Sequence, residues 1–169
     1  MPETKRADWD DYFMSIAKVV ATRATCDRLH VGAVIVVDRT IVSTGYNGSP
    51  RGMPHCDDVG HLLKDMGGRK SCVRTAHGEA NAITQAARTG VRVEGGTIYT
   101  TASPCYDCMK LIINSGIVRI VCGAPYASRY GLSNDAGELA NLAGVVLDFL
   151  SVVPLETKSE NTGEQTKTT

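Results

Sequence analysis

The sequence has no excess charge of either sign, no long apolar run and no export signal. Its 169 residues include 18 Lys and Arg against 18 Asp and Glu, so the formal net charge is zero. Without a broad basic field, little attracts a nucleic-acid backbone, which favours a small substrate over a polymer. No stretch approaches the roughly 20 apolar residues of a membrane span, and residues 1–13 contain no signal-peptide core. We therefore expect a cytoplasmic protein without membrane or nucleic-acid partners.

Two further features are missing, an internal repeat and a second domain. Apolar residues make up 43% of the chain and charged residues 21%, as in ordinary globular proteins. We predict a single domain over residues 1–155, including a long irregular loop at 47–76. Residues 156–169 lack apolar side chains and are predicted to form a disordered polar tail.

The pattern of apolar residues predicts alternating helices and strands. Helices are expected at 8–24, 77–90, 105–116 and 134–144, and strands at 31–37, 41–46, 96–101, 117–123 and 145–150. The first two strands are joined by three residues and predict a hairpin. Asp8 is the predicted N-cap of the first helix, and Gly90 is predicted to end the second. This alternation predicts a three-layer α/β/α domain around a mixed sheet of about five strands.

The chain contains six cysteines, and their use is the next question. They are Cys26, Cys56, Cys72, Cys105, Cys108 and Cys122. Without an export signal, metal ligation is favoured over disulfide bonds for most of them. Cys122 lies in the apolar stretch "IVRIVCG" and is predicted to be a core residue.

One histidine and two cysteines have the spacing of a zinc site. His77 lies at the start of one predicted helix, and Cys105 and Cys108 open the next. Thiolates at a helix N-terminus are stabilised by the helix dipole. Three protein ligands leave zinc one open position, as in catalytic sites, where the metal makes hydroxide available near neutral pH.

Glu79, two residues after His77, is the predicted acid/base group. As a carboxylate that does not bind the metal, it could take a proton from water and give one to a leaving group. "HGE" followed by "PCYDC" matches the H-x-E and P-C-x-x-C signature of zinc nucleobase deaminases. A redox Cys pair or half of a structural zinc site are the alternatives for the two cysteines alone, but the combined motif is far more specific.

The chain resembles the deoxycytidylate (dCMP) deaminase family, which has the cytidine deaminase-like fold. The resemblance rests on "DWDDYFMSIA", "VGAVIV", "STGYNGSPRG", "HGEANAI" and "SPCYDCMKLIINSGI". It implies hydrolysis of dCMP to dUMP and ammonia, with dUMP supplied to thymidylate synthesis. It also implies that Glu79 protonates N3 and the departing amine, that backbone groups of Ala76 and Ser103 hold the base edge, and that Asn47 contacts the sugar. An Asn-Gly pair is also common in plain turns.

The chain departs from the family at Gly78, where relatives usually have Ala or Val. We expect this glycine to remove a methyl group beside the reacting water and to loosen the pocket, which raises the question of 5-substituted cytosines.

The 5′-phosphate of such a substrate needs a cationic partner. Four arginines lie in predicted loops or at element edges: Arg28, Arg51, Arg74 and Arg129. Guanidinium groups bind phosphate bidentately. Arg74 is the preferred candidate because it precedes His77 by three residues. Tyr126 and Tyr130 could cover the nucleotide or serve as packing residues.

A second zinc site would explain how the irregular loop 47–76 is ordered. Some members of the family carry a second, structural zinc, and four residues could form a closed tetrahedral site here: Cys26, Cys56, His61 and Cys72. His55 is a rival fourth ligand, but adjacent residues such as His55 and Cys56 rarely bind one ion. Three separately buried thiols are the alternative.

The family resemblance also implies regulation and assembly. Many members are homohexamers that dCTP activates and dTTP inhibits, and Mg²⁺ could accompany the nucleotide effector. Gly45, Tyr46, Asn47 and Gly48 match the effector region. The alternatives are a deaminase of 5-methyl-dCMP or another modified cytosine nucleotide, of cytidine or of tRNA adenosine, or a zinc-stabilised nucleotide-binding module without turnover.

Overall fold

A five-stranded mixed sheet forms the centre of the protein. The structure, a computed structural model, describes residues 6–66, 68, 70–125 and 133–150. The strands are β1 (Gly32–Val37), β2 (Thr40–Tyr46), β5 (Thr97–Thr100), β6 (Arg119–Cys122) and β7 (Val146–Phe149), in the spatial order β2-β1-β5-β6-β7. β1 runs antiparallel to β2 and β5, whereas β5, β6 and β7 are parallel. The predicted mixed sheet is confirmed.

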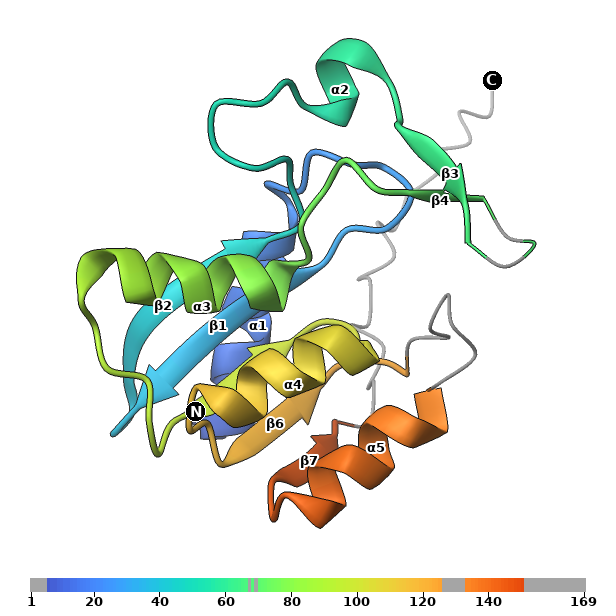
Figure 1. Ribbon diagram of the computed structural model, residues 1–169. Coiled ribbons are helices and arrows are strands. Elements are labelled where there is room, and N and C mark those ends of the chain that lie inside the picture. The colour runs from blue at the N-terminus through green and yellow to red at the C-terminus, as the bar shows by residue number, and fades with distance from the viewer. Residues whose placement is uncertain (1–5, 67, 69, 126–132, 151–169) are drawn as a thin grey trace, which may run out of the picture.

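Helices cover both faces of this sheet (Figure 1). They are α1 (Trp9–Ala21), α3 (Gly78–Thr89), α4 (Tyr106–Asn114) and α5 (Ser133–Leu142). Alternate residues of β1 divide the core: Val34 packs with Phe13 of α1, whereas Ile35 packs with the cluster that contains Ala82 of α3 and Ile112 of α4. Because both faces of β1 are buried, its sequence is continuously apolar rather than alternating. The three-layer α/β/α fold is confirmed.

Local signals at the ends of the elements behave as expected. The Asp8 carboxylate accepts a hydrogen bond from the backbone N–H of Asp10, at 3.0 Å, and caps α1. Gly90 ends α3 in the left-handed conformation, with φ 71°. Asp38 and Arg39 have φ 48° and 60°, so they form the tight turn of the β1–β2 hairpin.

Two glycines let helices approach the hairpin closely. A methyl group at Gly45 would overlap the carbonyl oxygen of Gly78 and the backbone nitrogen of Ala82. A methyl group at Gly32 would overlap the carbonyl oxygen of Ala17, on the other face. The start of α3 is therefore seated directly on β2, which fixes the height of His77 and Glu79 above the sheet.

A charged network ties the first turn of α1 to the sheet. The Arg119 guanidinium donates two hydrogen bonds to the Asp10 carboxylate, at 2.8 and 2.7 Å, and one to Asp148 at 2.8 Å. The Tyr99 hydroxyl donates to Asp10 at 2.8 Å. Hydrogen bonding from Arg119 is the main cause that lowers the pKa of Asp10. The charged form of Asp10 therefore stabilises the fold.

Replacing Asp10 by asparagine should lower the free energy of unfolding by about 1–3 kcal/mol, because the charge-assisted bonds to Arg119 are lost. Since the pKa is lower in the folded state, this stabilisation is present above about pH 5 and is lost as the pH falls through the folded pKa. Urea unfolding at pH 7 checks the prediction. Asp11→Asn, one residue further along α1 and exposed, is the control, and an equal loss in both variants would contradict the role of the network.

The segment 47–76 contains short elements that the sequence pattern does not predict. They are α2 (Cys56–Val59), β3 (Leu63–Asp65) and β4 (Lys70–Cys72), and β3 and β4 pair antiparallel. In Figure 1 this segment projects beyond one edge of the three layers. Elements of three or four residues are too short to show a period, so the expectation of an irregular loop is wrong in this detail.

Among the described residues, no helix is long and apolar enough to cross a membrane. The predicted tail at 156–169 lies outside the described residues, as do Tyr126, Arg129 and Tyr130.

Candidate zinc centre and active site

The predicted histidine and cysteine ligands meet where two helices begin. His77 and Cys105 occupy the N-cap positions of α3 and α4. The His77 Nδ1 atom lies 3.3 Å from the Cys105 Sγ and 3.4 Å from the Cys108 Sγ. Cys105 and Cys108 are buried. We call His77, Cys105 and Cys108 the three-residue group.

These separations fit a zinc ion. Zinc–sulfur and zinc–nitrogen bonds of about 2.3 and 2.05 Å at the tetrahedral angle place the two donor atoms about 3.6 Å apart. All three donor atoms lie within 4.8 Å of one another. The hydrogen bond between the two thiols lowers the pKa of Cys105 and raises that of Cys108, so one thiolate is already favoured and a bound metal would displace the proton from the other.

Glu79 lies at the same helix start and is 3% exposed. Burial is the largest cause that raises the pKa of its carboxyl, to about 7, against the opposing effect of His77. A group that titrates near neutral pH can both accept and donate a proton. Glu79, His77 and Cys105 line one cavity.

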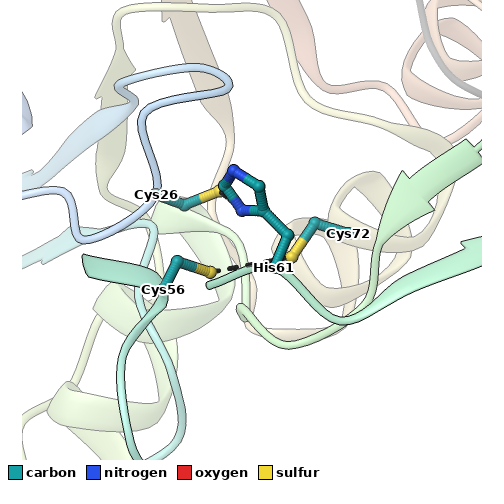
Figure 2. Close-up of side chains that lie close together, drawn as sticks. All are labelled: Cys26, Cys56, His61 and Cys72. Atoms are coloured by element: carbon teal, nitrogen blue, oxygen red, sulfur yellow. Dashed lines mark hydrogen bonds between the residues drawn. The ribbon is translucent and has the colours of Figure 1, made fainter. Parts of the chain in front are cut away.

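Four other residues form a second group of donor atoms (Figure 2). We call Cys26, Cys56, His61 and Cys72 the four-residue group, and their ligand atoms lie within 4.8 Å of one another. Cys56 Sγ is 3.7 Å from Cys72 Sγ, and Cys26 Sγ is 3.7 Å from His61 Nδ1. Zinc would place two thiolates about 3.8 Å apart, whereas a disulfide would need about 2.05 Å. The group fits a closed zinc site.

His61, rather than its rival His55, points into this group. Its Nε2 atom lies 3.1 Å from the Asp27 carboxylate, so Nδ1 is the atom directed at the thiols. Such a carboxylate partner on the far ring nitrogen is common for metal-binding histidines. The Nδ1 atom of His55 instead lies 3.0 Å from the Thr25 hydroxyl. Asp27 has no motif of its own, and its role was not predicted.

Comparison with known proteins decides the family. The model of the cytidine and deoxycytidylate deaminase zinc-binding region matches residues 7–124, which include both groups. The chain belongs to the cytidine and deoxycytidylate deaminase family. The predicted family is therefore confirmed, and so is zinc as the metal. The residues that bind zinc stay a prediction, and so does a second zinc ion.

This deaminase-family chain is similar to known proteins of bacteria and phages. ComE operon protein 2 of Bacillus subtilis is 42% identical over 144 residues, which are 85% of this chain and 72% of that protein. Deoxycytidylate deaminase of Mycobacterium phage D29 is 42% identical over 124 residues, 69% of this chain and 94% of that protein. A crystal structure of dCMP deaminase from cyanophage S-TIM5 with dCMP and dUMP is 26% identical, with a TM-score of 0.67 over 89% of this chain and 98% of that one.

In this deaminase-family chain, one cavity of about 240 Å³ adjoins both groups of donor atoms. Asn47 and Ser103, predicted to bind substrate, line it together with Glu79. The Asn47 amide also accepts from Val31 N–H at 2.7 Å and donates to the Leu29 carbonyl at 2.8 Å, so it anchors the segment before β1. Ala76 does not line the cavity.

The arginine preferred from the sequence lies elsewhere. The Arg74 Nε–H donates to the carbonyl of Gly60 at 3.1 Å, and Arg74 is not among the cavity-lining residues. Arg28 does line the cavity, and its Nη2 donates to the carbonyl of Lys70 at 3.1 Å. Proximity in sequence to His77 is a poor guide because neighbouring side chains face different ways: Thr75 lines the cavity, whereas the Arg74 side chain turns to Gly60.

Gly78 does not loosen the pocket, and the expectation from the sequence is wrong on this point. A methyl group there would lie 3.2 Å from the Val31 carbonyl oxygen and 3.4 Å from that of Gly45. A methyl group at position 78 would therefore pack against Val31 and Gly45, and Gly78 itself does not line the cavity. A small residue at position 78 serves the close packing of α3 on β2.

Proposed function

We propose that this protein is a zinc-dependent deoxycytidylate deaminase. The reaction replaces the 4-amino group of dCMP by oxygen from water, which gives dUMP and ammonia, and the dUMP serves thymidylate synthesis. The observation that carries the proposal is the buried Glu79 carboxyl beside the three-residue group, in the wall of one cavity. Relatives named deoxycytidylate deaminase, at 42% identity in the phage D29 protein, support dCMP as substrate.

In this proposal His77, Cys105 and Cys108 hold the catalytic zinc. When bound, the metal supplies an activated water near neutral pH. Glu79 accepts a proton from water, donates it to N3 of the base, and passes the next proton to the amine that leaves C4. A pKa near 7 suits both directions of proton transfer. The balance closes: the C4–O bond forms first, the proton left on that oxygen passes through Glu79 to the 4-amine, and the C4–N bond then breaks to give ammonia and the 4-oxo group.

Substrate orientation is assigned to the cavity wall. Asn47 and Ser103 line the cavity, which supports contacts to the sugar and the base edge respectively. The Ala76 N–H and carbonyl both pair with Gly48, so a contact of Ala76 with the base would use the second lone pair of its carbonyl oxygen. Tyr126, which lies outside the described residues, stays a candidate from its loop sequence to cover the nucleotide.

The four-residue group is proposed to hold a second, structural zinc. Its support is the tetrahedral spacing of the donor atoms and the Asp27 carboxylate on the far nitrogen of His61. The segment that it would order, 47–76, has little core of its own, since Met53, Val59, Leu62 and Leu63 are all exposed. A closed metal site can replace the missing apolar packing.

Control by dCTP and dTTP, with Mg²⁺ accompanying the effector, and a homohexamer remain part of the proposal. Two contacts support the effector region at the end of β2. Asn81 of α3 donates to the carbonyl of Tyr46 at 2.7 Å, and Gly48 pairs with Ala76, next to His77. A shift of this segment would therefore reach the catalytic helix directly.

The test is ammonia release from dCMP, CMP, deoxycytidine, 5-methyl-dCMP and a tRNA, with and without dCTP or dTTP. We expect turnover of deoxynucleoside monophosphates, with kcat/KM at least 100-fold higher than for deoxycytidine. This ratio corresponds to about 3 kcal/mol, which charge-assisted hydrogen bonds to a phosphate can supply. Turnover of tRNA or of cytidine nucleotides alone would assign another deaminase activity. Zinc binding without any turnover would favour a binding module.

A further inference from the structure

The cavity beside Glu79 is walled on one side by the four-residue group. Cys26 and Cys72 of that group line it, as do His77 and Cys105 of the three-residue group. Both groups of donor atoms therefore share one cavity. A structural zinc with no bearing on substrate would more simply lie away from it.

Arg28 supplies the positive charge of this wall. Among the described residues that line the cavity, Arg28 is the one arginine or lysine. Its contact with the Lys70 carbonyl uses one of the five N–H donors of a guanidinium. The remaining donors can meet a phosphate bidentately. Ser71, next to Lys70, lines the cavity as well and adds a hydroxyl.

The chemistry of the proposed reaction decides where the phosphate lies. The C4 carbon of the base must reach Glu79 and the three-residue group, so the 5′ end of the nucleotide extends away from them. The wall formed by the four-residue group carries the cation that this end needs. Arg28 lies two residues after Cys26, and its partner Lys70 lies two residues before Cys72.

Both ends of the Arg28–Lys70 contact are thus attached to the four-residue group. Cys26 enters the group from the segment after α1, and Cys72 from the end of β4. The next residue after Arg28 is Leu29, and the Asn47 side-chain amide donates a hydrogen bond to the Leu29 carbonyl. A metal that joins Cys26 to Cys72 would fix the guanidinium in place and lower the entropy lost on binding phosphate.

We propose that Arg28 binds the 5′-phosphate of the nucleotide, and that the four-residue group, with its metal, holds Arg28 in position. This inference rests on the proposed function for the class of substrate. The protein would then distinguish a nucleotide from a nucleoside at the side of the cavity that is formed by the four-residue group and its metal. Arg28 is a specificity residue, and the four-residue group positions it.

The first experiment compares kcat/KM for dCMP with kcat/KM for deoxycytidine. Arg28→Gln should lower this ratio about 10- to 100-fold, mainly through KM for dCMP, as the loss of charge-assisted bonds requires. Arg74→Gln is the matched control and should keep the ratio. If Arg74→Gln lowers the ratio and Arg28→Gln does not, the assignment to Arg28 is overturned.

A binding experiment makes the inference independent of turnover. Calorimetry should show that dUMP binds wild-type protein at least 10-fold more tightly than deoxyuridine, and that Arg28→Gln removes most of this difference. Failure of the wild-type protein to deaminate dCMP would count against the proposed function. Equal affinities of the wild-type protein for dUMP and deoxyuridine would count against phosphate binding by Arg28.

The positioning role is tested from a residue that does not touch the cavity. Cys56 belongs to the four-residue group but does not line the cavity. Cys56→Ser should therefore lower the dUMP preference as Arg28→Gln does. If the metal strengthens phosphate binding, phosphate binding must strengthen metal binding by the same factor. In the wild-type protein, dUMP should therefore slow the release of zinc from the four-residue group to a chelator, and deoxyuridine should not. If dUMP leaves that release unchanged, or Cys56→Ser keeps the full preference, the positioning role is wrong.

Discussion

Glu79→Gln should lower kcat for dCMP by about 10³-fold or more, within the range for loss of a general acid/base, while zinc content stays the same. Glutamine keeps the size and the hydrogen-bonding atoms of the buried side chain but cannot exchange a proton. Because Glu79 lies outside the three-residue group that we propose as the metal ligands, the metal should remain bound. Steady-state kinetics and zinc analysis of the same sample check both parts.

Glu138→Gln is the control, since Glu138 is an exposed glutamate on α5 and should keep full turnover. A Glu79→Gln variant that retains turnover would remove Glu79 as the proton carrier. A variant that loses zinc together with turnover would instead make Glu79 a metal ligand or a residue needed to fold the site.

Local signals in the sequence were enough for most of the fold. The β1–β2 hairpin followed from apolar runs on both sides of Asp38 and Arg39, which take the positive φ of a tight turn. Asp8 and Gly90 marked the ends of helices because capping depends on neighbouring residues alone. The spacing of His77, Cys105 and Cys108 indicated the metal site because these residues lie at the starts of two helices. The start of a helix can be predicted from neighbouring residues.

Features that depend on contacts distant in sequence could not be predicted in this way. Arg28 and Lys70 are 42 residues apart, and neither belongs to a motif. The sequence places Gly78 beside the reacting water, whereas in the structure the neighbours of position 78 are Val31 and Gly45. The four-residue group could be predicted because cysteine and histidine have few other roles in such a loop. Aspartate has many roles in loops, so the sequence did not single out Asp27.

Removing one thiol of the four-residue group should reduce the metal content from two zinc ions per chain to one. Cys56→Ser should also expose the segment 53–71 to trypsin, which can cut after Lys64 in β3 and Lys70 in β4. Structural zinc sites contribute about 10 kcal/mol or more to the folding of their segments, and the exposed apolar side chains of this segment offer no comparable packing. Metal analysis and mapping of the tryptic fragments measure the two effects.

Cys122→Ala is the matched control, because Cys122 is a buried thiol of the main core and burial raises its pKa to about 12. This variant should lose some stability from the cavity that it creates and still bind two zinc ions. One zinc per chain in the wild-type protein, with the segment 53–71 resistant to trypsin, would mean that the three buried thiols Cys26, Cys56 and Cys72 order the loop by packing alone. Two zinc ions and a loop that opens only in Cys56→Ser would make the metal the core of this segment, and the wall that carries Arg28 would then depend on it.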